Sequence, residues 1–488
     1  MVSPEVQTSL CSEPLDVSPE AFEEGLARIA CEPLFRDAED GEIEIAGNPF
    51  RRPTRLDDHR FIDFFAPLSR DQLTSNASLA ANRLLLILYE LDLVFLPVDG
   101  KPEGLEDFRS FYGDGIRKAA GALRPVLERF LFGFLDDAVD VTGRWRADDL
   151  FAYLAECEDG FAEAEHGDLD AITGCRDPKA AAQAYLIQFA PDFLSEASAM
   201  ARNTLGAFGP MQSDLFKILI DEYGYGVHAS KHSTLFQDAL RSVGLVPEVH
   251  RYWQFYLPTS FLLTSYFHYI SKNHRYFFRY LGALFYTESS LVSTTRAQSH
   301  ALRQIFGESV DTRYFDEHTH IDAHHGRMSL DGLIHPAVAR FGDAVIPEIL
   351  RGFEEFRLLE DIASQDFVAQ IRWADAAADY ERAAKALYAR IESGELDLPM
   401  ETFAEVLGER STTHVHDDDR LLVLETGEMD FWPIYGPPRR YVAGDHMLVP
   451  RHRLHGSVVR SEESIYHQPL VPPELMAETV SRIETRSR

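Results

Sequence analysis

The pattern of apolar residues changes once along the chain, and this change constrains the fold more than any other feature. As far as Arg390 the apolar residues recur at helical spacing, and the segment ESGELDLPM then supplies Gly and Pro breakers. Short strand-like runs follow, namely RLLVLETG, DFWPIYG, YVAGDHMLVP, GSVVRS and SIYHQPL. A long helical part followed by a small β sandwich or barrel of roughly 90 residues predicts a multidomain protein of the α plus β type.

The helical part is expected to hold two units. Residues 1–145 contain Leu- and Phe-rich helices, at 84–95 and 116–134, without clusters of titratable side chains. Such helices usually serve as core or interface, so we predict a helical N-terminal domain that forms a homodimer. Residues 146–392 are helical and unusually aromatic, which predicts one bundle domain. Residues 393–488 form the β domain, with a helix or a loose tail from about Pro473.

Composition narrows the classes of partner. The 488 residues carry 47 Lys+Arg against 79 Asp+Glu, a formal net charge of −32, and 45% are hydrophobic. A disordered or fibrous protein does not fit this hydrophobic content. The negative charge repels phosphate backbones and anionic lipids, and no basic run offsets it, so we expect neither nucleic acid nor a membrane surface as partner. A small cationic molecule is favoured.

The cysteines and the N-terminus indicate the compartment. Cys11, Cys31, Cys157 and Cys175 lie far apart without CxxC spacing, so no disulfide framework or zinc site is predicted. The first residues lack the basic and apolar regions of a signal peptide. The apolar stretch at 84–98 is interrupted by acidic residues and is too short to cross a bilayer. We therefore expect a cytoplasmic protein without membrane spans.

The clearest site signal is FDEHTHIDAHHGR in the middle domain. His318, Asp322 and His325 stand at positions i, i+4 and i+7, which share one helix face within roughly 40°. Two imidazoles and a carboxylate from one helix suit iron or manganese, which accept both nitrogen and oxygen ligands. The alternative is a solvated polar face.

Further candidate ligands come from three other segments that read as helices. Glu196, Glu288 and the pair Glu222 and His232 all sit among apolar residues, where a charge is costly unless it is paired or metal-bound. Each could instead be an ordinary salt-bridged or exposed glutamate. On one ideal helix Glu222 and His232 would point roughly 80° apart, although the glycines between them can distort the backbone.

Together these residues supply four carboxylates and three histidines, enough to hold two irons in a bundle core and leave positions open for dioxygen. The order Glu, Glu-x9-His, Glu, His-x3-Asp-x2-His resembles that of the haem-oxygenase-like diiron oxidases. The resemblance implies a seven-helix bundle that holds non-haem iron. Glu288 and His318 resemble the additional ligands found in the N-oxygenases of that superfamily.

A second constellation lies in the β-rich part. In GERSTTHVH, His414 and His416 are two positions apart, so on a strand both imidazoles face one side. GDHMLVPRHRLH then places a glycine, a proline and His455 at a spacing that, with the first motif, resembles the two cupin motifs. The glutamate of the first motif is replaced by Arg420 or Leu421, and the inner glycine of the second is His452.

The cupin resemblance therefore implies a three-histidine site at His414, His416 and His455. Three neutral ligands leave an Fe(II) ion up to three positions for a chelating substrate and dioxygen. The alternative is a barrel that has lost its metal together with the glutamate. Tyr466, on a following strand, is a candidate for a catalytic side chain facing the same cavity, and a core tyrosine is its other interpretation.

The combination of a helical N-terminal layer, a diiron bundle and a three-histidine cupin resembles the family of N-nitrosourea-forming metalloenzymes of streptozotocin biosynthesis. The resemblance implies an enzyme that oxidises Nω-methyl-L-arginine in two stages. The bundle would hydroxylate Nδ and the unmethylated terminal nitrogen of the guanidine, with dioxygen as co-substrate and electrons from an external donor. The cupin would then rearrange the product to an N-nitrosourea. The implied metals are two Fe(II) ions on Glu196, Glu222, His232, Glu288, His318, Asp322 and His325, and one on His414, His416 and His455.

Two alternatives remain open from the sequence. The chain could be a diiron N-oxygenase that acts on another amine or guanidine, with a cupin that is only structural. It could also be a metal-dependent sensor or scaffold, although no helix-turn-helix, basic arm or signalling module is visible to supply an output.

Overall fold

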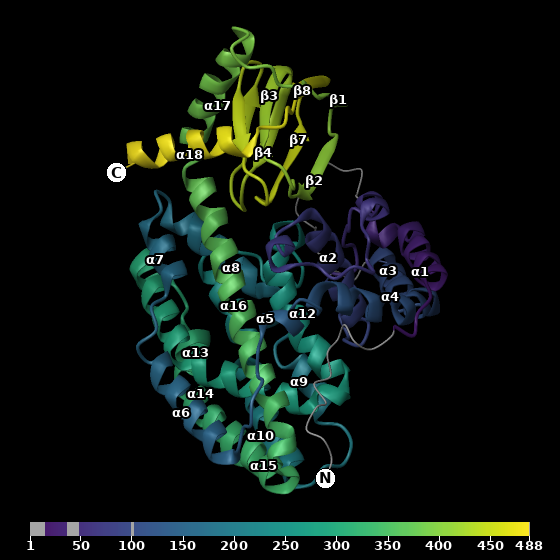
Figure 1. Ribbon diagram of the computed structural model, residues 1–488, viewed down its shortest axis with the longest axis vertical. Coiled ribbons are helices and arrows are strands. Elements are labelled where there is room, and N and C mark those ends of the chain that lie inside the picture. The colour runs from purple at the N-terminus through teal and green to yellow at the C-terminus, as the bar shows by residue number, and fades with distance from the viewer. Residues whose placement is uncertain (1–14, 37–47, 99–101, 488) are drawn as a thin grey trace.

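A long helical bundle carries a second group of helices on one side and a β sandwich at one end (Figure 1). The computed structural model describes residues 15–36, 48–98 and 102–487. Cys11 lies outside these residues, and the other three cysteines are free thiols. None of the described helices is long and apolar enough to span a bilayer.

The first group of helices is built around one that is almost wholly buried. This helix, α2, begins after Ser75, whose hydroxyl accepts a hydrogen bond from the backbone of Ser78 and so caps the helix start. It ends at Glu90, so the predicted helix at 84–95 begins earlier and stops before Phe95. The group comprises α1 (Pro19–Cys31), α2 (Asn76–Glu90), α3 (Pro102–Phe111), α4 (Asp114–Phe132) and α5 (Leu135–Ala138).

The bundle is organised around two long helices whose backbones touch. A Cβ atom on Gly282 of α13 would lie 1.8 Å from the carbonyl oxygen of Ile349 on α16, and one on Gly352 would lie 1.8 Å from that of Arg279. Glycine is therefore required at both crossing points. The helices are α6 (Ala147–Phe161), α7 (Gly167–Gly174), α8 (Pro178–Phe193), α9 (Ser198–Asn203), α10 (Pro210–Glu222), α11 (His232–Ser242), α12 (Pro258–Lys272), α13 (Phe277–Phe306), α14 (Arg313–Ser329), α15 (His335–Phe341) and α16 (Ile346–Asp375). A further helix, α17 (Ala377–Glu392), follows α16 and leads to the β domain.

The C-terminal part consists of two antiparallel four-stranded sheets, in the orders β1-β8-β3-β6 and β2-β7-β4-β5. This arrangement fits the expected cupin-like β domain. The strands are β1 (Thr402–Val406), which the sequence pattern did not predict, β2 (Arg410–His414), β3 (Arg420–Thr426), β4 (Glu428–Trp432), β5 (Arg439–Val442), β6 (His446–Val449), β7 (His455–Val459) and β8 (Glu463–His467). The chain ends in helix α18 (Pro473–Ser487).

The position of strand β3 explains why its sequence is continuously apolar. Leu422 and Leu424 face the space between the sheets, whereas Leu421 and Val423 pack against α17 and α18 on the outer face. Because both faces are covered, the strand shows no alternation of polar and apolar residues. Helix α17 thus packs on the β sheets, and its contacts assign it to the β domain. The boundary at 392/393 stays a prediction.

The N-terminal helices and the bundle share one continuous hydrophobic core, which reaches Leu454 and Val458 in the β domain. The side chain of Arg83 on α2 also reaches the β domain. Its Nη1 and Nη2 donate to the carbonyl oxygen and the hydroxyl of Thr413, at 2.9 Å each. All three parts of the chain therefore meet beside strand β2.

Candidate metal centres

Helix α14 presents its three predicted ligands to the interior of the bundle. His318, Asp322 and His325 are 2%, 0% and 0% exposed, whereas His320 and His324 on the other face are exposed. The carbonyl oxygen of Tyr314, one turn earlier, accepts a hydrogen bond from Nδ1 of His318 at 2.7 Å. This bond leaves Nε2 of His318 as the atom available to a metal.

Glu222 and His232 do not lie on one helix, and the single-helix geometry considered from the sequence is wrong. Glu222 ends α10, the chain passes through two 3-10 turns, and His232 begins α11. Gly224 adopts a φ of +58°, and a Cβ there would lie 2.5 Å from the carbonyl carbon of Ser230. This turn brings Oε2 of Glu222 to 2.7 Å from Nδ1 of His232.

Glu196 also lies outside the helices, in the turn between α8 and α9, where Ala197 has a φ of +62°. Its Oε1 accepts a hydrogen bond from the hydroxyl of Tyr314 at 2.6 Å and lies 3.3 Å from Nε2 of His318. Glu288 is buried on α13, as expected, with its Oε2 3.2 Å from Nδ1 of His325.

The seven side chains form two groups of potential ligands that share one residue. In each group the ligand atoms lie within 4.8 Å of one another, and Glu222 belongs to both. The groups are Glu196, Glu222, His232 and His318, and Glu222, Glu288, Asp322 and His325. A shared carboxylate flanked by two such groups is the arrangement that two neighbouring metal ions require.

Unsatisfied polar atoms at this site also fit a metal. Both carboxylate oxygens of Asp322 and Oε2 of Glu196 are buried without a hydrogen-bond partner. Burial raises the pKa of Asp322 well above its ordinary value. Burial lowers the pKa of His318, but Asp322 and Glu196 raise it more, and the net pKa lies well above the usual range. Without a cation the cluster would hold protons, so metal binding would release them.

Two residues that the sequence reasoning missed support these ligands. Oδ2 of Asp221 lies 3.2 Å from Nε2 of His325 and so orients that ring, and Tyr314 bonds both Glu196 and His318. Each was marked only by its spacing: Asp221 precedes Glu222, and Tyr314 stands four residues before His318 on the same helix face.

The second centre lies where strands β2 and β7 pair. His414 is directly opposite His455 in the ladder, and His416 follows two residues later. The three rings lie close together, with centroids 4.4, 4.7 and 5.0 Å apart. Their nitrogens form a third group of potential ligands. Nε2 of His416 and Nε2 of His455 are buried without a hydrogen-bond partner.

In two of these imidazoles, backbone carbonyl groups determine which ring nitrogen carries the proton. Nδ1 of His414 donates to the carbonyl oxygen of Thr412, and Nδ1 of His455 donates to that of Arg453, at 2.9 Å each. Nε2 is therefore the free nitrogen of each ring. Burial lowers the pKa of His416 to about 2 and that of His455 to about 4. The rings are neutral at neutral pH, as metal ligands must be.

The two positions that replace the cupin glutamate supply no further ligand. Arg420 donates to Glu401 and to the carbonyl oxygen of Gln468, and Leu421 is fully buried in the core between β3 and the C-terminal helices. The third group contains only imidazoles among the described residues. Tyr466 lies on β8, in the opposite sheet, where it stacks on Phe403 and donates to Oε1 of Glu405 at 2.7 Å.

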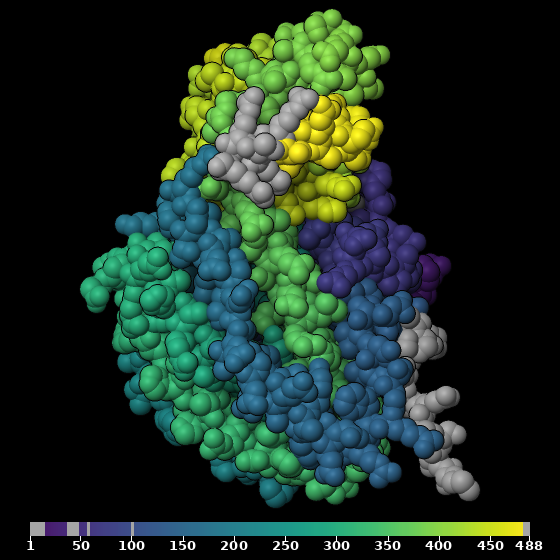
Figure 2. Space-filling model, turned by 60° about the vertical axis from the view of Figure 1, so that its left-hand side comes forward, coloured from purple at the N-terminus to yellow at the C-terminus, as the bar shows by residue number. Residues whose placement is uncertain are grey.

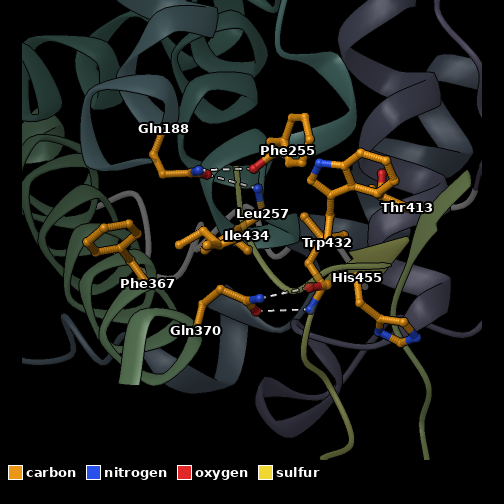
Figure 3. A pocket seen from close by; sticks show the side chains of 10 residues that line it. Gln188, Phe255, Leu257, Phe367, Gln370, Thr413, Trp432, Ile434 and His455 are labelled. Carbon is orange, nitrogen blue, oxygen red and sulfur yellow. Dashed lines mark hydrogen bonds between the residues drawn. The ribbon is translucent and has the colours of Figure 1, made fainter. Parts of the chain in front are cut away.

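Gln370 on helix α16 of the bundle holds the loop that leads into His455 (Figure 3). Nε2 of Gln370 donates to the carbonyl oxygens of Leu454 and Pro433, at 2.7 and 2.6 Å, and its Oε1 accepts from the backbone of Leu454 at 2.9 Å. Arg55 adds a contact from the N-terminal side by donating to the carbonyl oxygen of Thr412 at 3.0 Å. The cupin-like centre is thus positioned by residues of the other two parts.

Comparisons with known proteins identify a family for the bundle and a relative of nearly the whole chain. Residues 183–361 match the family described as iron-containing redox enzymes, a range that includes all seven carboxylates and histidines of the bundle site. Over 454 residues the chain is 46% identical to the nitrosourea synthase of Streptomyces achromogenes subsp. streptozoticus. The match covers 93% of this chain and 96% of that protein.

Proposed function

Because the chain belongs to the nitrosourea synthase family, we propose that it is an iron-dependent oxygenase that converts Nω-methyl-L-arginine into an N-nitrosourea. The observation that carries this proposal is the presence of two dissimilar ligand sets in one chain. One is rich in carboxylates and spans four segments of the bundle, and the other consists of three neutral imidazoles in the β domain.

In the bundle, seven side chains would hold two irons, which when bound would supply the reduction of dioxygen needed to hydroxylate the guanidine nitrogens. Glu222 would help to hold both irons because it belongs to both groups. Asp221 would hold the ring of His325, and Tyr314 would hold Glu196 and His318, so that these ligands keep their orientation. Each hydroxylation requires two electrons from an external donor.

In the β domain, His414, His416 and His455 would hold a single iron, whose full positive charge would favour chelation of the hydroxylated guanidine. The backbone carbonyls of Thr412 and Arg453 keep Nε2 of His414 and His455 unprotonated. The surroundings of His455 are aromatic, since Phe431 stacks on it at 5.5 Å between centroids and Trp373 packs edge-on at 6.3 Å. These rings exclude water from one side of the centre.

We further propose that residues 1–145, 146–392 and 393–488 act as dimerisation, hydroxylation and rearrangement units of a cytoplasmic homodimer. The three described cysteines are free thiols, which supports a reducing compartment.

The experiment that tests this function follows the two stages separately. The protein is loaded anaerobically with Fe(II) and exposed to dioxygen with Nω-methyl-L-arginine and a reductant, and the products are identified by mass spectrometry. We expect an N-nitrosourea from the native chain and accumulated hydroxylated arginine from His414→Ala. His467→Ala, a histidine of the same domain outside the triad, is the control and should behave like the native chain. If the native chain stops at hydroxylation, its cupin-like part is structural; if it oxidises nothing, the substrate is wrong.

A further inference from the structure

A cavity of about 270 Å³ lies inside the bundle, between α7, α8, α12, α13 and α16. Figure 2 shows the face on which the segment of α6 and α7 (blue) lies beside α16 (green), the elements that border the cavity on this side. The volume is slightly below the range of about 300–1,000 Å³ typical of small-molecule sites, so it suits a ligand of amino-acid size. Glu165 and Asp361 are exposed and therefore mark the end that opens to solvent.

The charges that line this cavity all have the same sign. Its wall contains five carboxylates, and none of the described residues that line it is a lysine or an arginine. The carboxylates are Glu165, Asp168, Asp192, Glu360 and Asp361. Enclosed carboxylates without cationic partners are costly to the folded protein, and a cationic ligand removes that cost.

Two of the carboxylates that line the cavity come from different helices, α8 and α16. Asp192, at the end of α8, has its pKa raised to about 7 by burial and by the charge of Glu196. Glu360, on α16, accepts a hydrogen bond from the hydroxyl of Tyr286. Burial nevertheless raises the pKa of Glu360 to about 7, and Asp361 and Asp168 act in the same direction. Neither carboxylate has an ion-pair partner among the described residues.

The Asp192 end of the cavity adjoins the metal centre of the bundle. Asp192 precedes the ligand Glu196 by four residues, and Phe193, which also lines the cavity, packs on Tyr314 at 5.1 Å between ring centroids. Tyr314 in turn donates to Glu196. On α13, Thr287 and Ser290 line the cavity on either side of the ligand Glu288. A group held near Asp192 would therefore lie next to the diiron ligands.

We propose that this cavity binds the arginine substrate of the bundle centre, with Asp192 pairing with the guanidinium group and Glu360 pairing with the α-ammonium group. The inference rests on the proposed function and adds the side chains that orient the substrate. The two cationic groups of an arginine derivative match two carboxylates that line one cavity from different helices. Binding in this direction places the guanidine nitrogens, which are to be hydroxylated, beside the ligand cluster.

The test pairs each substitution with an analogue that lacks the group it is proposed to bind. Binding to the iron-loaded protein is measured calorimetrically without dioxygen, so that no reaction occurs. The probes are Nω-methyl-L-arginine, L-citrulline, in which a neutral urea replaces the guanidinium, and 5-guanidinopentanoate, which lacks the α-ammonium. Asp192→Asn should lower the affinity for Nω-methyl-L-arginine at least about tenfold and leave the affinity for citrulline unchanged. Glu360→Gln should lower the affinity for Nω-methyl-L-arginine by a similar factor and leave the affinity for 5-guanidinopentanoate unchanged.

Stability separates a binding role from a structural one. Since each substitution removes an unpaired enclosed charge, the unfolding temperature of the free protein should stay the same or rise while affinity falls. Iron content is measured in each variant, and Glu158→Gln, an exposed position on α6, is the matched control. If both cavity variants bind all three probes like the native chain, the inference is wrong. If the variants lose affinity as expected but the native chain forms no nitroso product, the cavity assignment stands and the proposed function fails. If the native chain forms the nitroso product but the variants keep their affinities, the proposed function stands and the cavity assignment fails.

Discussion

The carboxylate of Glu222 lies 2.7 Å from Nδ1 of His232, although one side chain ends helix α10 and the other begins α11. The other oxygen of Glu222 lies 3.3 Å from Nδ1 of His325 on α14. Glu222 is therefore the residue at which the two groups of ligands in the bundle meet.

This position predicts that Glu222 is needed for both irons of the bundle. We expect Glu222→Ala to lose both irons of the bundle and to keep only the iron of the β domain. Glu196 belongs to only one of the two groups, so Glu196→Ala should lose a single iron. Iron per chain, measured by elemental analysis after anaerobic loading and desalting, distinguishes the two. Glu317→Ala, on the exposed face of α14, serves as control. Equal iron content in Glu222→Ala and Glu196→Ala would contradict the shared role.

Gly224 shapes the turn between these ligands. Alanine at this position would have to adopt a φ of +58° and place its Cβ 2.5 Å from backbone atoms of Ser230. We expect Gly224→Ala to lower the free energy of unfolding by about 2–4 kcal/mol and to reduce iron binding in the bundle.

Gly226 offers the matched comparison. It also has a positive φ, at +81°, but open space surrounds its Cβ position. Gly226→Ala should therefore cost only about 1 kcal/mol, measured by chemical denaturation of the iron-free protein. If the two variants are equally stable, the contact with Ser230 does not shape the turn.

Gln370 is predicted to support the second stage of the reaction from outside the β domain. Gln370→Met has a similar shape but leaves the backbone groups of Leu454 and the carbonyl oxygen of Pro433 without their partner. Each buried unsatisfied group costs about 1–3 kcal/mol, so the loop before His455 should loosen. Mass spectrometry should then show hydroxylated arginine accumulating at the expense of the nitroso product.

The control for this prediction is Gln183→Met, which removes a hydrogen bond to the carbonyl oxygen of Val243 within the bundle. It should not change the ratio of the two products. A normal product ratio in Gln370→Met would mean that the loop keeps His455 in place without help from α16.

The buried carboxylate of Glu90 should make the free energy of unfolding depend on pH. Burial raises the pKa of this carboxyl, but His250 and Arg52 lower it more, so that the folded pKa is about 2 against an ordinary 4.5. A carboxyl whose pKa is depressed by folding stabilises the protein above its unfolded pKa. This contribution, on the order of 3 kcal/mol, is lost as the pH falls from 4.5 toward 2.

Urea unfolding of the native chain and Glu90→Gln between pH 6 and pH 3 measures this contribution. The native chain should be more stable at pH 6, and the difference should shrink as the pH falls below 4.5. Glu103→Gln, exposed on α3, should follow the native chain at every pH. A constant difference between the native chain and Glu90→Gln would show that the effect is not electrostatic.

Local sequence determined the elements and the ligand types. The spacing of His318, Asp322 and His325 already required a common face, because a helix repeats every 3.6 residues. Likewise, two histidines at i and i+2 on a strand had to point the same way, and the change of apolar period near 390 separated helices from strands. These relations depend only on residues close together in the chain.

Only the tertiary structure decided how Glu222 meets His232 and His325, since the bend at Gly224 depends on the backbone of Ser230. It also decided that Gln370 holds the loop before His455, that Arg83 holds strand β2, and that Asp192 and Glu360 line one cavity. These contacts join residues far apart in sequence, so no local period encodes them. They arise when helices and sheets pack, because burial then fixes which polar atoms remain unsatisfied and where a metal or a cation is needed.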